Sequence, residues 1–126
     1  MEHIRITFSV LRDNQLFVKR SKSSFGMQQI EFFGHVISVE GVSADPSKIH
    51  AMVSWPRHSN HKELRSFFGL TNYYRRFIQH YGNICRTLHD ILKNEKFSWN
   101  SEVEGAFTNL KSALTSAPLL ALPNFA

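Results

Sequence analysis

Apolar residues recur with the spacing of a helix in the middle of the chain, between residues 62 and 80. This stretch, KELRSFFGLTNYYRRFIQH, has no proline and a single glycine, Gly69, and the pattern predicts one amphipathic helix over 62–80. Its apolar face consists of Leu64, Phe67, Phe68, Leu70, Tyr74, Phe77 and Ile78. Its other face consists of Lys62, Arg65, Gly69, Asn72, Tyr73, Arg76 and His80.

The polar face of this helix has two interpretations. In the simpler one, the helix covers a core and its basic side is solvated. In the other, the helix lies against a nucleic-acid backbone or groove. The pattern alone favours the first. Gly69 is the feature that fits the second, because a glycine inside a helix costs about 1 kcal/mol relative to alanine. It lets a bulky partner approach the backbone between Arg65 and Tyr73, each one helical turn away.

The segment before this helix predicts one helix and a small β-hairpin. Ile4, Phe8 and Leu11 have amphipathic spacing, so residues 2–12 are expected to be helical. A short strand is expected over 16–18. The segment 30–38, IEFFGHVIS, is rich in β-branched and aromatic residues and predicts a strand, with Gly34 as a bulge or point of close approach. A turn at 39–41 then leads to a return strand that begins at 42–43.

Local signals place three more helices around the central one. Asp45-Pro46 is a typical helix start, and the helix that follows ends at Trp55-Pro56. Asn60 with Glu63 resembles a capping box for the central helix, which Tyr81-Gly82 are expected to close. Apolar periodicity predicts helices over 84–93 and 101–117, the latter opened by Ser101 with Glu104 and stopped by Pro118. Residues 119–126 resemble the first strand of a further domain, and both ends look cut from a larger, modular enzyme.

Composition narrows the class of partner. The 126 residues include 15 Lys and Arg against 10 Asp and Glu, a net charge of +5, which favours polyanionic partners. A single cysteine, Cys85, excludes an internal disulfide framework and fits a reducing, intracellular compartment. No apolar run approaches the roughly 20 residues that cross a membrane, so no membrane partner is expected.

Groups for catalysis are scattered along the sequence. Two-metal polymerases and nucleases need several carboxylates at one site, whereas Asp13, Asp45 and Asp90 are far apart. His58 and His61 lack the cysteine pair or HExxH pattern of a zinc site. We therefore expect no catalytic residue, no metal and no cofactor.

Two longer motifs carry a resemblance to a known family. F-x-G-H-V-I-S and L-R-S-F-x-G-L-x-x-Y-Y-R-R-F-I, within a likeness that runs from about His3 to Phe125, resemble the reverse transcriptase of Ty3/gypsy-type retrotransposons. In that family the first motif is the primer grip, a hairpin at the border of palm and thumb, and the second is a thumb helix that follows the minor groove of the template–primer duplex. The resemblance implies nucleic-acid contacts at Phe32, Phe33, Gly34, His35, Lys62, Arg65, Gly69, Tyr73 and Arg76.

The resemblance also implies a domain division and an activity. Residues 1–44 would be a palm remnant with its hairpin, 45–117 a helical thumb-like subdomain, and 118–126 the start of the connection to ribonuclease H. The overall class is then α+β, an N-terminal helix and small hairpin followed by a mostly helical bundle. Because the family's polymerase carboxylates lie upstream of this region and its ribonuclease H carboxylates downstream, the chain alone is expected to be inactive and to bind template–primer duplex weakly.

Departures from the family pattern keep a second hypothesis open. Ser23 replaces a common cysteine, Phe33 and Phe68 replace leucines, and Thr87 stands where proline is common. Such changes fit packing adjustments in a thumb, and they also fit a domesticated or non-functional relic that acts, if at all, through protein–protein interaction. Three further expectations are independent of this choice: self-association, a partner chain that supplies the missing palm, and an organellar origin such as a plant mitochondrion.

Overall fold

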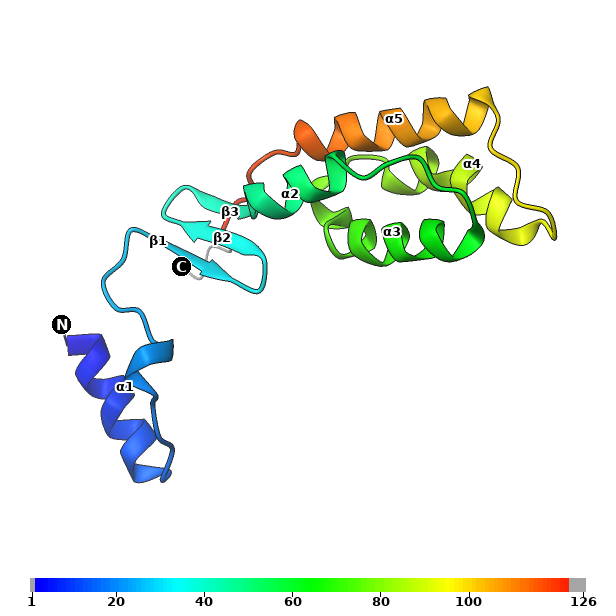
Figure 1. Cartoon of the computed structure of the whole chain (residues 1–126). Coiled ribbons are helices and arrows are strands. Elements are labelled where there is room, and N and C mark those ends of the chain that lie inside the picture. The colour runs from blue at the N-terminus through cyan, green and yellow to red at the C-terminus, as the bar shows by residue number, and fades with distance from the viewer. Residues whose placement is uncertain (1, 123–126) are drawn as a thin grey trace.

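The computed structural model describes residues 2–122. In this range one helix and a small antiparallel sheet precede a bundle of four helices (Figure 1). The helices are α1 (Glu2–Asp13), α2 (Pro46–Val53), α3 (His61–Tyr73), α4 (Tyr81–Lys93) and α5 (Ser101–Thr115), with short 3-10 helices η1 (Arg20–Lys22) and η2 (Arg75–Phe77). The strands are β1 (Gln29–Phe32), β2 (His35–Ser38) and β3 (Gly41–Ala44). This order confirms the predicted α+β class.

The hydrophobic core lies inside the four-helix bundle. Helix α5 runs beside both α4 and α2, while α3 contacts α2 and α4 from the other side (Figure 1). The largest fully buried apolar side chains are Phe67, Met52, Leu64, Leu88, Leu110 and Leu114. All members of the predicted apolar face of 62–80 are buried except Leu70, which is half-buried. Burial of this stripe is what holds α3 against its neighbours.

The predicted single helix over 62–80 is wrong, because the structure breaks it into two parts. Helix α3 ends at Tyr73, η2 follows, and α4 begins at Tyr81. His80 has a left-handed backbone with φ of 56° just before α4, so Tyr81 opens a helix where the sequence pattern predicted an end. This arrangement turns the chain back so that α4 packs along α3. Neither proline nor glycine marks the break, and the apolar periodicity continues across it.

The predicted strand over 30–38 is also wrong, because it is a complete hairpin. Phe32 in β1 pairs with His35 in β2, so Phe33 and Gly34 are the two turn residues. Their φ values of 48° and 73° fit a type I′ turn, whose twist matches that of the flanking strands. Gly34 is therefore a turn glycine and not a bulge. Strand β2 pairs in turn with β3, which gives a three-stranded meander.

Residues 2–18, the N-terminal segment, contribute nothing to the core. The helix predicted over 2–12 is confirmed as α1, yet it has no buried residue and lies apart from the bundle (Figure 1). The strand predicted over 16–18 is wrong, since those residues have no regular structure. A strand needs a neighbour to satisfy its backbone groups, and no strand in residues 2–122 pairs with this segment.

The helix caps follow the sequence closely, with one shift. Asp45 and Asn60 accept hydrogen bonds from the backbone amides of Ser47 and Glu63, at 2.8 and 3.0 Å. The cap of α5 is Asn100, not the predicted Ser101, and it accepts from the amide of Val103 at 2.9 Å. Glu104, the expected partner in the capping box, instead accepts a bond from the indole Nε1 of Trp99.

The chain returns to the sheet after α5. The backbones of Leu120 and Val42 exchange two hydrogen bonds of 2.8 Å, so the last described residues add one bridge to the edge of β3. The strand expected over 119–126 falls partly outside the described residues, which end at 122. Over the same described range, no helix is both long and apolar enough to span a bilayer.

Candidate nucleic-acid interface

The turn between β1 and β2 projects two aromatic rings into solvent. Phe32 and Phe33 are 57% and 76% exposed. Their rings pack edge to face, with the ring centroids 4.6 Å apart. His35 is half-buried, and its Nδ1 lies 3.0 Å from the carbonyl oxygen of Phe33. The four hairpin residues named from the sequence thus form the tip of the hairpin, with Gly34 at its second turn position.

Two consecutive tyrosines of the α3–η2 junction tie this turn to the bundle. The hydroxyl of Tyr73 donates to the carbonyl of Phe33 at 2.6 Å, and the hydroxyl of Tyr74 donates to the carbonyl of Gly34 at 3.1 Å. Burial is the main cause that raises the pKa of Tyr74, and the nearby Asp45 and Tyr73 raise it further. Its hydroxyl therefore stays protonated and able to donate at neutral pH. These hydrogen bonds join the two sequence motifs, that of the hairpin and that of the helix, into one surface.

Helix α3 presents an open, basic side next to this turn. Lys62, Arg65, Gly69 and Tyr73 are all exposed, and their spacing places them on one face of the helix. A Cβ added at Gly69 would meet no atom within 4 Å, so nothing in the described residues covers the helix backbone there. The predicted polar face is thus solvent-accessible as far as Tyr73. Arg76 lies beyond the helix, in η2.

A polar hollow of about 400 Å³ lies where the hairpin meets the end of α3. It is lined by His35 of β2, by Asn72 and Tyr73 of α3, and by Arg75 and Arg76 of η2. Residues 72 and 75 are not among the nucleic-acid contacts that the family resemblance implies. Asn72 faces the same side as Tyr73 in the helical pattern, but only the break after Tyr73 brings Arg75 and His35 beside it.

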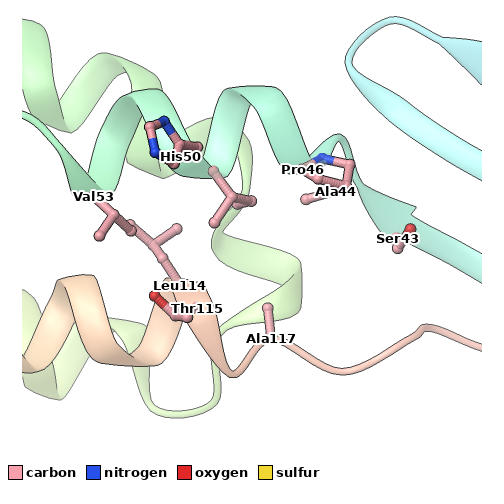
Figure 2. Close-up of a pocket in the computed structure, with 9 residues that line it drawn as sticks. Ser43, Ala44, Pro46, His50, Val53, Leu114, Thr115 and Ala117 are labelled. Carbon is pink, nitrogen blue, oxygen red and sulfur yellow. The ribbon is translucent and has the colours of Figure 1, made fainter.

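A second hollow, of about 330 Å³, is of a different character. Figure 2 shows it between α2 and the end of α5, where Ile49, Val53 and Leu114 supply apolar side chains. His50 is the one ionisable residue among those that line it. A groove of this composition offers no site for a phosphate.

Carboxylates and histidines do not converge on a catalytic or metal centre. Asp45 caps α2, Asp90 pairs with Lys93 at 2.7 Å, and Asp13 ends α1. In residues 2–122 no group of three potential metal ligands lies together. His58 is buried in a box of aromatic rings from Trp55, Phe67, Trp99 and Phe107. That environment is a packed core and not a ligand set.

Comparison of the sequence with known proteins gives one relative that the chain covers over most of its length, and others that it covers only in small part. No protein-family model matches. The chain is 46% identical over 126 residues to an uncharacterized mitochondrial protein of Arabidopsis thaliana, covering 98% of this chain and 80% of that protein. It is 34% identical over 127 residues to the retrovirus-related Pol polyprotein from transposon 297 of Drosophila melanogaster, covering 99% of this chain. It is 30% identical over 121 residues to the transposon Tf2-3 polyprotein of Schizosaccharomyces pombe, covering 95% of this chain. The chain spans only 12% and 9% of these two polyproteins.

Solved structures with the same fold come from a viral enzyme. The foamy viral protease-reverse transcriptase dRH in complex with double-stranded DNA aligns with a TM-score of 0.83 at 25% identity, over 95% of this chain and 22% of that one. The same enzyme in complex with an RNA/DNA hybrid aligns with a TM-score of 0.81 at 24% identity, over 95% of this chain and 17% of that one.

Proposed function

This chain belongs to the Ty3/gypsy-type retrotransposon reverse transcriptase family, and from that premise we propose that it is a module without polymerase activity of its own that grips the backbone of a template–primer duplex. The hairpin tip would hold one strand, and the exposed side of α3 would follow the duplex beside it. The residues proposed to make contact are Phe32, Phe33, Gly34, His35, Lys62, Arg65, Gly69, Tyr73 and Arg76.

The observation that carries this proposal is the pair of tyrosine hydrogen bonds to the hairpin turn. Through Tyr73 and Tyr74 the turn and α3 are held in one orientation. A ligand therefore contacts both at once, and little of the protein has to become ordered when the ligand binds. The Tyr73 ring remains 49% exposed and is free to pack on a sugar. Gly69, with open space at its Cβ, lets that sugar approach the helix backbone.

The charge of this surface supports the same ligand class. In residues 2–122 the ion pair of Lys93 with Asp90 is the only one, so no carboxylate neutralises Lys62, Arg65 or Arg76. Unpaired cations of this kind give affinity for phosphates with little sequence preference. The foamy viral structures, which contain nucleic acid, support the proposal by analogy.

The proposed lack of polymerase activity rests on what the aspartates do in this fold. Phosphoryl transfer by two metal ions needs carboxylates that converge on both ions. Asp45 and Asp90 are engaged in a cap and a surface ion pair, and Asp13 is at the end of the separate helix α1. We also propose the division into residues 1–44, 45–117 and 118–126, as palm remnant, thumb-like unit and start of the connection. The order of one helix and a small sheet before a four-helix bundle supports it.

Equilibrium binding of the purified chain to a labelled template–primer duplex, titrated with salt, tests the proposal. We expect micromolar or weaker affinity at physiological salt, since the contacts are few and non-specific. Gly69→Leu should weaken binding and leave the helix formed, because leucine is the better helix former. Arg76→Ala should lower the slope of log affinity against log salt by roughly one unit.

The control variant is Arg86→Ala, which removes an exposed cation of α4 that is not among the proposed contacts. If the wild type, Gly69→Leu, Arg76→Ala and the control variant all bind equally across the titration, the proposed interface is refuted. A separate assay for nucleotide incorporation with Mg²⁺ should give no extension of the primer; extension by the pure chain would refute the proposed lack of activity.

A protein–protein role is the second candidate, and one observation favours it. The N-terminal segment exposes large apolar side chains, among them Phe17 at 99%, Leu16 at 59% and Ile6 at 56%. Such a group of exposed apolar residues is typical of surfaces that contact another protein. Under this hypothesis the chain associates with itself or with a chain that carries a palm, and it shows no salt-dependent affinity for the duplex.

A further inference from the structure

We propose that two copies of this chain associate through the free edge of the sheet, with β1 of one copy antiparallel to β1 of the other. The pairing joins the two three-stranded meanders into one continuous sheet of six strands. This inference does not rest on the proposed contact with a duplex. It gives self-association a defined surface and a defined register.

The two edges of the sheet differ in how they are covered. At β3, Leu120 covers part of the edge through two backbone hydrogen bonds with Val42. Along β1, the only strand partner in residues 2–122 is β2, and every residue of β1 is exposed. Proteins usually block such an edge with lysine, proline or a bulge, because it can pair with another chain. Strand β1, QIEF, contains neither lysine nor proline, and its register with β2 has no bulge.

The register of the hairpin shows which backbone groups of β1 point outward. The two-residue turn pairs Phe32 with His35, and in such a turn the N–H after the turn bonds to the carbonyl before it. Hydrogen-bonded and non-hydrogen-bonded pairs alternate along an antiparallel ladder, so Ile30 and Phe32 bond to β2. The N–H and C=O groups of Gln29 and Glu31 therefore point away from β2, toward the free edge.

A two-fold axis at Ile30 satisfies all of these outward groups. Gln29 of each copy then lies opposite Glu31 of the other, and the two residues of each pair exchange both backbone hydrogen bonds. Their side chains share one face of the sheet, where the amide of Gln29 can donate to the carboxylate of Glu31. On the other face, Ile30 meets Ile30 of the second copy in a closely spaced pair. This pair continues the row that Ile30 forms with Ile37 of β2.

The neighbouring registers are worse. An axis at Glu31 places two carboxylates opposite each other, which is unfavourable, and it opposes Gln29 to Phe33 in the turn. An axis at Gln29 opposes Glu31 to Met27, which lies outside β1. The edge of β1 is therefore complementary to itself in one register, and this self-complementarity identifies a second copy as the partner.

The same features predict a weak dimer that salt strengthens. Pairing covers Ile30 and Phe32, which lie on one face of β1 and are 38% and 57% exposed in the single copy. One short strand from each copy makes a small interface, of the class that gives weak association. Each copy also carries a net charge of +5, and salt screens the resulting repulsion. Duplex binding has the opposite dependence, because salt weakens it.

Sedimentation equilibrium of the full chain without nucleic acid measures the association. We expect the average mass to rise from that of a monomer toward that of a dimer between micromolar and millimolar protein, and to rise further at higher salt. Hydrogen exchange by NMR locates the interface. The outward amides of Gln29 and Glu31 should gain protection as the concentration increases. Those of Ile30 and Phe32, already bonded to β2, should change less.

The variant Glu31→Pro tests the edge directly. It removes an outward N–H that β2 does not use, and an edge strand tolerates proline at such a position. The rise in mass should be lost, while NMR shifts of β2 report whether the hairpin persists. The matched control is Phe17→Ser, which changes a side chain that is 99% exposed in the N-terminal segment and should leave the association unchanged.

Two substitutions at Gln29 test the register without touching the backbone. Gln29→Lys places a cation opposite Glu31 of the second copy and should tighten the dimer about three- to tenfold, since the symmetric pair forms twice. Gln29→Glu places like charges there and should weaken the dimer by a similar factor. Effects in the same direction would refute the register, even if Glu31→Pro fails to fold.

Each remaining outcome decides for or against the edge. If Glu31→Pro keeps its hairpin and associates like the wild type, the edge is refuted. If Phe17→Ser abolishes the association, the N-terminal segment is the interface and the edge is refuted. A constant monomer mass with no gain of protection at Gln29 and Glu31 also refutes it. Duplex binding is measured separately by the salt titration, so either proposal can fail while the other stands.

Discussion

The hydroxyl of Tyr74 donates to the carbonyl oxygen of Gly34, 40 positions earlier in the chain, at 3.1 Å. The same hydroxyl fills the space that a side chain at position 34 would need, because a Cβ there would lie 2.6 Å from it. Gly34 also has a φ of 73°, in the left-handed region that glycine tolerates best. The hairpin turn and the bundle therefore constrain each other through this one pair.

We predict that Gly34→Ala and Tyr74→Phe are coupled. Gly34→Ala should destabilise the hairpin by about 2 kcal/mol, through its left-handed backbone and the close hydroxyl. Tyr74→Phe should cost about 1 kcal/mol for the lost hydrogen bond. The double variant should lose less than the sum, because removal of the hydroxyl gives the new methyl group room.

Hydrogen exchange at the amide of Asp45 measures this coupling, since that amide donates to the Gly34 carbonyl at 2.9 Å. If the stability losses of the two single variants add up to that of the double variant, the Tyr74 hydroxyl does not restrict the side chain at position 34.

Gly69→Ala should behave in the opposite way. Position 69 lies inside α3 with ordinary helical backbone, and an added Cβ meets no atom within 4 Å. Alanine should therefore stabilise the bundle by roughly 1 kcal/mol. Urea denaturation followed by tryptophan fluorescence measures the change. A loss of stability would mean that α3 needs the glycine for its own fold, and the functional argument for Gly69 would lose its basis.

Buried His58 should make the bundle less stable in mild acid. Burial is the main cause that lowers the pKa of His58. The charge of Glu63 in α3 raises this pKa, and the charge of Lys111 in α5 lowers it further. The unfolded chain then binds a proton more readily than the folded one, so the free energy of unfolding falls as the pH drops below about 6.5. The contribution of His58 is fully present above that pH.

The variant His58→Leu tests this dependence. The Nε2 of His58 is buried without a hydrogen-bond partner, so an apolar side chain of similar size should cost little at pH 7.5. The variant should lose less stability than the wild type between pH 7.5 and 5, measured by urea denaturation. The matched control, His50→Gln, changes an exposed histidine of α2. If His58→Leu and the wild type have the same pH dependence, His58 is not the responsible group.

Hydrogen exchange should divide the chain near residue 42. Helix α1 has no buried residue and every residue of β1 is exposed, whereas α3 contributes Leu64, Phe67 and Phe68 to the core. Amides before Val42 should therefore exchange quickly and those of α3 slowly, because local opening costs little where few apolar contacts are lost. Equal protection in both parts would contradict this and would indicate that the N-terminal surface is covered in a dimer.

The sequence by itself determined the elements whose signals are local. The apolar spacing of residues 2–12, 84–93 and 101–117 and the cap at Asp45 depend on residues within one or two helical turns, and the structure has a helix at each place. It also determined the family and the α+β class, because the two long motifs carry them. The buried side of the 62–80 stripe followed from periodicity alone, since a helix must bury its apolar face.

Only the tertiary structure decided where the long apolar stripe breaks and where the hairpin turns. The break after Tyr73 contains no proline or glycine, and what marks it is the return of α4 along α3. The turn at Phe33 and Gly34 uses a phenylalanine at positive φ, which no local preference favours. Hydrogen bonds from Tyr73 and Tyr74 support that backbone from 40 positions away. The hollow at Asn72 and Arg75 follows from both features, so long-range contacts, which periodicity does not encode, define it.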